Sequence, residues 1–306
     1  MPSLRSTSSS AALALALTLA ARGAYAQACC AGGNALTPGR LPEDEWLLFG
    51  AQTIARPNMG SFDARGQWVG RPPHAQELDV EWDLFASWRT PYKRLQVTVL
   101  APLVLQTRAV QGDAAAAFGF GDLNAALRLD VVDPKGLRPE TAILVGATFP
   151  TGVAPESSSA HLAVDATGTG TFRGTFGPGF EWRGHGPWIF DAIVLATLHA
   201  PRTVSGVEQV RAPGVLVTLA GTHVWEGGTS VGASLAYSME WNSFVDGKAV
   251  PDSARRVMRV GLFAMHPLGK GFRLQAGVGL DVPIPQLGQN ESAGTSLTVG
   301  LQRGFE

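Results

Sequence analysis

Four carboxylates stand at every second position of one short stretch. This spacing would let them line a path for a solute or form ion pairs. They are Glu77, Asp79, Glu81 and Asp83, and apolar residues, among them Val80, stand between them. Successive side chains of a β-strand point to opposite faces, so this stretch predicts a strand with one acidic and one apolar face. Carboxylates on an enclosed face would line a polar path for a solute or form a salt-bridged plug.

Residues suited to catalysis or metal binding do not have the required spacing. The six histidines are His74, His161, His185, His199, His223 and His266. None has a serine two residues on, as outer-membrane phospholipases need. No His, Cys or carboxylate grouping has metal-ligand spacing, and the glycines at Gly168 and Gly170 open no helix that could bind a nucleotide. The sequence therefore predicts no catalytic residue, no metal site and no cofactor.

The first residues have the features of an export signal. Arg5 supplies a positive charge, residues 11–21 are apolar, and residues 24–26 form a small-x-small cleavage site. We expect residues 1–26 to be a cleaved signal peptide, residues 27–44 a periplasmic N-terminal segment, and residues 45–306 the folded domain. The two cysteines, Cys29 and Cys30, are adjacent and cannot form a disulfide framework. Lipidation of Cys29 remains an alternative to a free N-terminus.

Composition narrows the class of protein. The net charge of -1 argues against a nucleic-acid partner, because such proteins need a basic excess. The chain has 37 glycines, 45% hydrophobic residues and 16% charged residues, and its apolar residues alternate with polar ones. This combination is typical of an all-β chain with many turns.

Segments of period two recur along the chain and predict twelve strands. They cover 45–60, 77–89, 94–108, 122–132, 140–151, 167–183, 187–199, 214–225, 229–242, 255–266, 272–282 and 293–305. Short turns alternate with longer loops such as 57–76 and 109–118. Outer-membrane barrels have short periplasmic turns, longer extracellular loops and an even strand count. We therefore expect an all-β fold, a transmembrane antiparallel up-and-down β-barrel of about 12 strands with both termini periplasmic.

The alternative fold is a secreted soluble sandwich, whose acidic face would be open to solvent. Two observations favour the barrel. The predicted strands approach the ~9–11 residues that cross a bilayer. Aromatic residues also lie near strand ends, where interfacial girdles form. They are Trp46, Trp88, Phe118, Trp182, Trp188, Trp225, Trp241 and Phe305.

The polar parity of the strands predicts which side chains line the lumen. They are Glu77, Asp79, Glu81, Asp83, Arg94, Gln96, Asp122, Asn124, Arg128, Arg173, Glu181 and Arg273. Buried charges need partners, so we expect the acidic ladder to pair with Arg94 or Arg128. A salt-bridged plug is favoured about two to one over an open path on this ground. The two can coexist, because a ladder of ion pairs can leave a narrow channel.

Three short motifs resemble a known family. They are Gly119 to Leu123, Phe149 to Gly152, and Gly168 to Gly170, in that order. They are similar to the Gly-x-Gly-Asp, Pro-Thr-Gly and Gly-x-Gly elements of the outer-membrane proteins named for the MetA pathway of phenol degradation. The resemblance implies an outer-membrane barrel with a role in the uptake of small, often aromatic, compounds.

The chain end resembles the signal that barrel-assembly machinery reads, with Thr298, Gly300 and Phe305 at its spacing, although Arg303 and Glu306 depart from it. The expected partners are outer-membrane lipid, this machinery through the C-terminal strand, and a small-molecule solute. We expect a non-enzymatic channel or transporter in the cell outer membrane. The alternatives are a structural or adhesive barrel with a plugged lumen, in which the long first loop contacts a partner, and then an outer-membrane lipid hydrolase.

Overall fold

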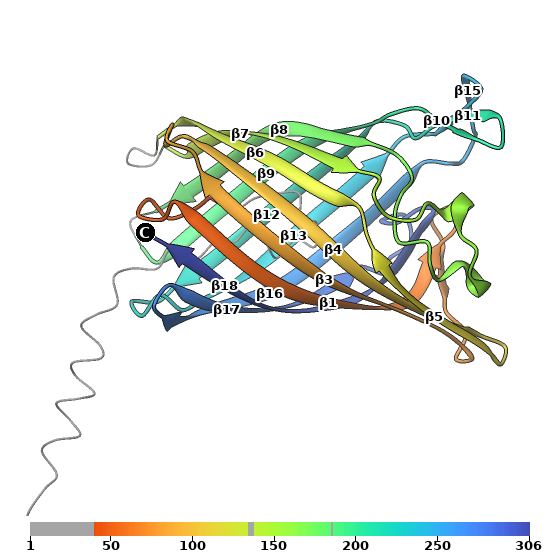
Figure 1. Ribbon diagram of the computed structural model, residues 1–306, viewed down its shortest axis with the longest axis horizontal. Helices are drawn as coiled ribbons and strands as arrows, with labels where there is room; N and C mark the ends of the chain where they lie inside the picture. Colours follow the sequence, from red (N-terminus) through yellow and green to blue (C-terminus); the bar gives the residue numbers. More distant parts are fainter. Residues whose placement is uncertain (1–39, 134–137, 185) are drawn as a thin grey trace, which may run out of the picture.

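The computed structural model describes residues 40–133, 138–184 and 186–306. The predicted signal peptide and both cysteines lie outside these residues. Within them, twelve antiparallel strands close into a barrel, because β18 pairs with β1 from Phe305 opposite Leu47 onward (Figure 1). The strands are β1 (Leu47–Phe62), β3 (Ala75–Arg89), β4 (Leu95–Val110), β6 (Leu123–Val132), β7 (Glu140–Phe149), β8 (Arg173–Arg183), β9 (Trp188–His199), β12 (Gly214–Val224), β13 (Ser230–Glu240), β16 (Arg255–Gly269), β17 (Phe272–Asp281) and β18 (Glu291–Phe305). The predicted barrel is confirmed.

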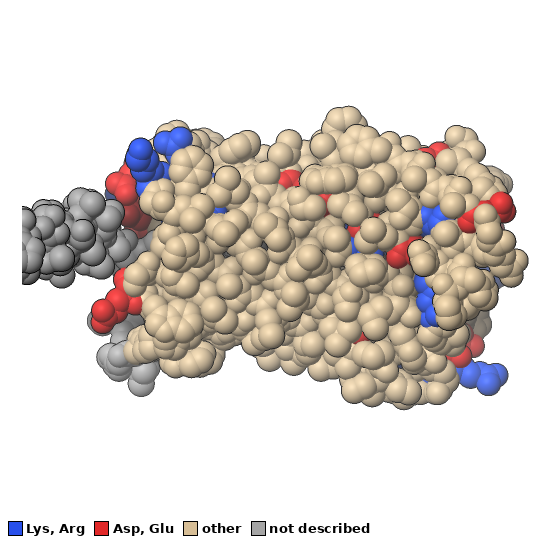
Figure 2. Space-filling model, turned by 90° about the horizontal axis from the view of Figure 1, so that it is seen from below, with Lys and Arg blue, Asp and Glu red and all other residues tan. Residues whose placement is uncertain are grey.

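The outer face of the barrel is apolar. Leu47, Phe49 and Ala51 point outward, and Gly50 and Gln52 point inward, as the strand period requires. Outward charged side chains lie only at strand ends within the described residues, as with Arg256 and Arg303. In Figure 2 most of the visible wall is free of charge, and charged side chains gather toward the two ends. Closing the sheet pairs every strand edge, which hydrocarbon surroundings demand.

The two ends of the barrel differ. The chain enters β1 and leaves β18 at the end that carries the short turns, and the longer loops lie at the other end (Figure 1). The two ends are named below by the orientation expected from the sequence, the short-turn end as periplasmic and the loop end as extracellular. These loops hold short strands: β2 (Trp68–Gly70) pairs with β1, and a small sheet is formed by β10 (Arg202–Val204), β11 (Val207–Val210), β14 (Phe244–Val245) and β15 (Lys248–Ala249). No helix among the described residues is long and apolar enough to cross a membrane.

Two sequence expectations about element bounds are wrong. Residues 109–118, expected as a loop, extend β4 and form most of β5 (Asp113–Phe120), which pairs with it. Gln111 and Gly112 both have positive φ, 51° and 95°, the conformation of a tight hairpin turn. The strand expected over 167–183 begins only at Arg173, because residues 167–170 bind the β5–β6 corner instead.

Candidate functional site: the lumen

The inward side chains are charged toward both ends of the barrel and mostly uncharged between them. On β17, for example, Arg273 and Asp281 enclose Gln275, Gly277 and Gly279. β8 repeats this order with Arg173 and Glu181, whereas most other strands carry inward charges at one end only. The inward middle positions of these strands are Gly50, Leu100, Ala126, Leu144, Gly177, Ile193, Leu195, Thr218, Ser234, Gly261, Phe263, Thr298 and Gly300. The exception is β3, whose acidic ladder reaches down to Asp83, which is fully buried.

Aromatic rings in this middle zone lie flat against the wall. The Phe85 ring lies over Gly50 of the neighbouring strand, where a Cβ would meet it at 2.4 Å. Phe263 covers Gly232 in the same way, also at 2.4 Å. Any larger residue at either glycine would push the ring toward the barrel axis. Each of these two glycines therefore lets the ring beside it lie against the barrel wall and not in the middle of the lumen.

One part of the middle wall is a compact apolar cluster. Ala142, Leu144, Ile193 and Leu195 are at most 4% exposed, and Leu216 packs against them. They come from β7, β9 and β12. β8, which lies between β7 and β9, presents Gly177 and Gly179 inward, and the Leu144 side chain lies over Gly179, where a Cβ would meet it at 3.2 Å. We call these five side chains the apolar wall.

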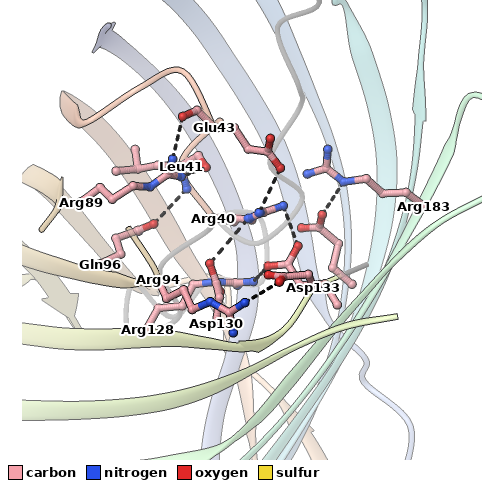
Figure 3. A network of polar contacts seen from close by, with 12 residues as sticks. Arg40, Leu41, Glu43, Arg89, Arg94, Gln96, Arg128, Asp130, Asp133 and Arg183 are labelled. Carbon is pink, nitrogen blue, oxygen red and sulfur yellow. Dashed lines mark hydrogen bonds and ion pairs between the residues drawn. The ribbon is translucent and has the colours of Figure 1, made fainter. Parts of the chain in front are cut away.

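A dense ionic network closes part of the periplasmic mouth (Figure 3). Arg128 contacts Asp130 at 2.8 Å and Glu140 at 3.0 Å. Arg40, from the segment that precedes the barrel, contacts the same two carboxylates, at 3.6 Å and 2.6 Å. Two arginines thus share two carboxylates, and the side chains are at most 12% exposed. Such satisfied pairs are tolerated in a low-dielectric interior.

Residues 40–46, here called the strap, follow this network along the rim. The Leu41 amide donates to Gln96 at 2.9 Å, and its side chain is fully buried. Arg89 donates to the carbonyls of Leu41 and Glu43. Glu45 forms an ion pair with Arg273, and Gly304 provides the space, since a Cβ there would lie 2.1 Å from the Glu45 carboxylate. The part of segment 27–44 that the structure describes therefore packs into the barrel mouth.

The acidic ladder has partners other than those expected. Glu77 pairs with Arg71 and with Arg108, the latter at 3.3 Å, and Glu81 pairs with Arg56. The expectation of Arg94 or Arg128 is wrong, because β3 and β4 run antiparallel. Their register places Glu77 opposite Arg108, whereas Arg94 lies in the turn at the opposite end and binds Asp133.

Two ladder carboxylates have no arginine in hydrogen-bond contact among the described residues. Asp79 keeps an oxygen without a hydrogen-bond partner, and Asp83 accepts one hydrogen bond, from Gln52 at 2.8 Å. Gln52 in turn accepts from Gln275 at 2.7 Å. This amide chain passes over Gly300 of β18, where a Cβ would lie 2.8 Å from the Gln275 amide nitrogen. Through Glu77 and Glu81, the group of four ladder carboxylates thus contacts three arginines of the described residues, Arg56, Arg71 and Arg108.

The three sequence motifs meet at the extracellular end in a hydrogen-bonded cluster around Asp122, here called the knot. Asp122 accepts hydrogen bonds from the backbone amides of Gly152, at 3.0 Å, and Thr169, at 2.7 Å, and from the Thr169 hydroxyl at 2.8 Å. Thr151 binds the Gly121 carbonyl at 2.8 Å, and Gly152 passes so close to Gly168 that a Cβ on either would collide with the other's backbone. The knot ties both ends of loop 150–172 to the β5–β6 corner.

The same loop is fastened along its length. Arg108 donates to the carbonyl of Leu162 at 2.8 Å, and Gln106 to that of Ala166 at 3.2 Å. Asp165 accepts from the Ser158 hydroxyl and from the Ser159 and Ala160 amides, and these hydrogen bonds lower its pKa. The loop therefore lies against the inner side of the β4–β5 hairpin, since Gln106 and Arg108 point inward.

The structure distributes the twelve predicted lumen residues over these regions. Arg128 and Glu181 lie in the periplasmic mouth with Gln96 and Arg273, and Arg94 lies beside it in an exposed turn. Asp122 and Asn124 lie at the knot, where Asn124 accepts from Thr148 at 2.8 Å. Arg173 also contacts Thr148, and the four ladder residues point inward from β3.

Sequence reasoning missed Arg40, Arg56, Arg108 and Glu140. The last three have inward parity on predicted strands and could have been found by it. No group of three or more His, Cys, Asp or Glu residues suited to a metal occurs in the described part of the chain.

Solved structures of outer-membrane proteins share this fold. The chain is similar to the "COG4313 outer membrane channel" of Pseudomonas putida F1, with 16% identity and a TM-score of 0.68 over 87% of this chain and 97% of that one. It is also similar to the translocator domain of the autotransporter NalP of Neisseria meningitidis, with 12% identity and a TM-score of 0.50 over 85% and 88%. No protein-family model and no curated protein sequence matches the chain. The fold is that of an outer-membrane β-barrel.

Proposed function

We propose that this outer-membrane barrel is a channel or transporter for small molecules with an apolar or aromatic body. The observation that carries the proposal is the mostly uncharged middle of the lumen, where Gly50 and Gly232 hold two aromatic rings against the barrel wall and the apolar wall lies between charged ends. Charges at both mouths keep those mouths hydrated, so a solute loses water only over a short middle stretch. The sequence resemblance to a family linked with aromatic compounds supports the same solute class.

Planar-bilayer recording of the refolded protein tests this proposal. We expect ohmic single-channel steps in KCl and a reduction of the current by small aromatic solutes, which would occupy the middle of the lumen. Solute-specific uptake into vesicles without conductance would identify a transporter. Absence of both conductance and uptake would contradict the proposal, and heat-denatured protein is the control for leak.

A second candidate is a structural barrel with a plugged lumen. The strap favours it, because Arg40 and Leu41 occupy the periplasmic mouth through ion pairs and burial. Recording from an Arg40→Ala variant separates the candidates. Conductance in the variant but not in the native protein would show that the strap closes a real channel, and silence in both would favour the plug.

We propose no enzymatic role. His266 contacts the Thr229 hydroxyl at 2.8 Å, and His199 contacts Glu240 at 3.3 Å. Neither histidine has both a nucleophile and a carboxylate within hydrogen-bond reach among the described residues, as an acyl-transfer triad requires. Incubation with phospholipid vesicles, followed by measurement of released fatty acid, tests this directly.

A further inference from the structure

A group of arginines lies directly on the extracellular side of the apolar wall. Arg173 begins β8, and its inward position is followed toward the periplasm by Thr175 and then by Gly177. Next to it on β9, His199 is followed in the same direction by Thr197 and Leu195. The guanidinium of Arg173 and the leucines of the apolar wall therefore lie on the same side of the lumen. Along each strand they are separated by two inward-facing positions, which is four residues.

Two arginines of this group form no ion pair among the described residues. Arg173 makes its only hydrogen bonds within the described residues to the Thr148 hydroxyl, at 3.2 and 3.4 Å. Arg211, in the loop before β12, makes none there, although it lies close enough to Arg173 to interact electrostatically. Burial and the nearby Arg255 lower the pKa of Arg211, yet an arginine keeps its charge.

The carboxylates nearby have partners of their own. Glu291 binds Arg255 at 2.9 Å, and Glu240 binds His199 at 3.3 Å. Asp122, whose charge also acts on Arg173, is held by the amides of Gly152 and Thr169. Neither Arg173 nor Arg211 therefore has a carboxylate within ion-pair distance among the described residues. A guanidinium in a low-dielectric lumen is stabilised by an anion that accepts two parallel N–H bonds, and a carboxylate has that geometry.

We infer that Arg173 and Arg211 recognise the carboxylate of a small apolar acid, whose hydrocarbon part lies on the apolar wall. This inference rests on the proposed function and names its solute class. A cavity of about 160 Å³ beside Arg211 gives the carboxylate space to approach from the extracellular side.

Binding to the refolded full chain in detergent tests the inference without requiring conductance. The probes are benzoate, its neutral analogue benzamide, and benzylammonium, which share one ring and differ in charge. By isothermal titration we expect benzoate to bind at least tenfold more tightly than benzamide, and benzylammonium to bind no better than benzamide. Arg173→Met should remove the preference for benzoate and leave benzamide binding unchanged, because it deletes the charge and keeps an apolar stem.

Arg94→Met is the matched control, since Arg94 lies in the turn at the far end and should leave all three affinities unchanged. Arg211→Met, in a loop outside the barrel wall, should weaken benzoate binding in the same sense if Arg173→Met does not fold. Equal affinities for benzoate and benzamide, no benzoate binding, or native benzoate binding in folded Arg173→Met or Arg211→Met would each overturn the inference. Benzoate binding by a protein that neither conducts nor transports would refute the proposed function but not this site.

Discussion

Replacing Asp122 by alanine should free loop 150–172 without unfolding the barrel. The carboxylate accepts two backbone amides and one hydroxyl from the two ends of this loop, at 2.7 to 3.0 Å. A hydrogen bond to a charged group contributes ~1.5–3 kcal/mol, so the two amides together amount to about 3–6 kcal/mol. Partial solvent access at the loop reduces this to about 2–4 kcal/mol of local opening free energy.

Hydrogen exchange measures that local free energy directly. Since ~1.4 kcal/mol is a factor of ten, protection of the Gly152 and Thr169 amides should fall by roughly 30- to 700-fold. Amides in the middle of β1 should keep their native protection, because their ladder bonds do not depend on the knot. In Asp122→Asn, the protection of the Gly152 and Thr169 amides should lie between that of the native protein and that of Asp122→Ala. The side chain keeps one oxygen that accepts a hydrogen bond, and the other is replaced by an amide nitrogen that cannot accept.

Unchanged protection of the two loop amides in Asp122→Ala would refute the reasoning, because the carboxylate would then not be holding the loop. Equal loss of protection in β1 would also refute it, by showing that the knot supports the whole barrel. A companion recording in planar bilayers should show larger or noisier currents from Asp122→Ala, since the released loop no longer lies against the β4–β5 hairpin.

Three further predictions follow from the barrel faces, the strap and the loop. Leu84→Arg places a charge on the lipid face of β3 and should cost about 2–4 kcal/mol in reversible urea unfolding from lipid vesicles, whereas Gln76→Arg at the strand end should cost about 0–1 kcal/mol; similar costs at both positions would contradict the lipid-facing assignment. The second prediction uses a Leu41→Cys reporter in a protein that lacks the two native cysteines. Arg40→Gln should raise the labelling of this thiol by an impermeant reagent added from the periplasmic side, with little loss of barrel stability because Arg128 retains both carboxylates. Labelling equal to that of the parent would show that the ion pair does not hold the strap. The hydrogen bonds that lower the pKa of Asp165 stabilise the loop when the pH is above the carboxyl's ordinary pKa of 3.8, and this stabilisation is lost as the pH falls through the folded-state pKa. Proteolysis of the loop by an acid protease should therefore accelerate below about pH 4 and become pH-independent in Asp165→Asn.

The sequence alone determined the barrel and the direction of nearly every strand side chain. A period of two assigns faces without knowledge of partners, so Leu47 and Phe49 could be placed outside and Gln52 inside from the alternation itself. Hydrocarbon then leaves a closed antiparallel sheet as the only arrangement that satisfies the strand backbones. Strand ends were predicted to within a few residues, except at residues 167–172, which precede β8 because 167–170 bind the β5–β6 corner, and at β5, which was expected as a loop.

Tertiary structure alone decided which inward residues meet. The register of the strands determines the ion-pair partners. Glu77 lies opposite Arg108 and contacts it, whereas Arg94, before the start of β4, lies at the other end of the barrel. The sequence carried the charges of the lumen but not their separation into two mouths, because strand tilt and stagger set the height of each side chain in a barrel. The knot at Asp122 and the strap at Arg40 join residues tens of positions apart in the chain, and such contacts depend on which strands lie side by side.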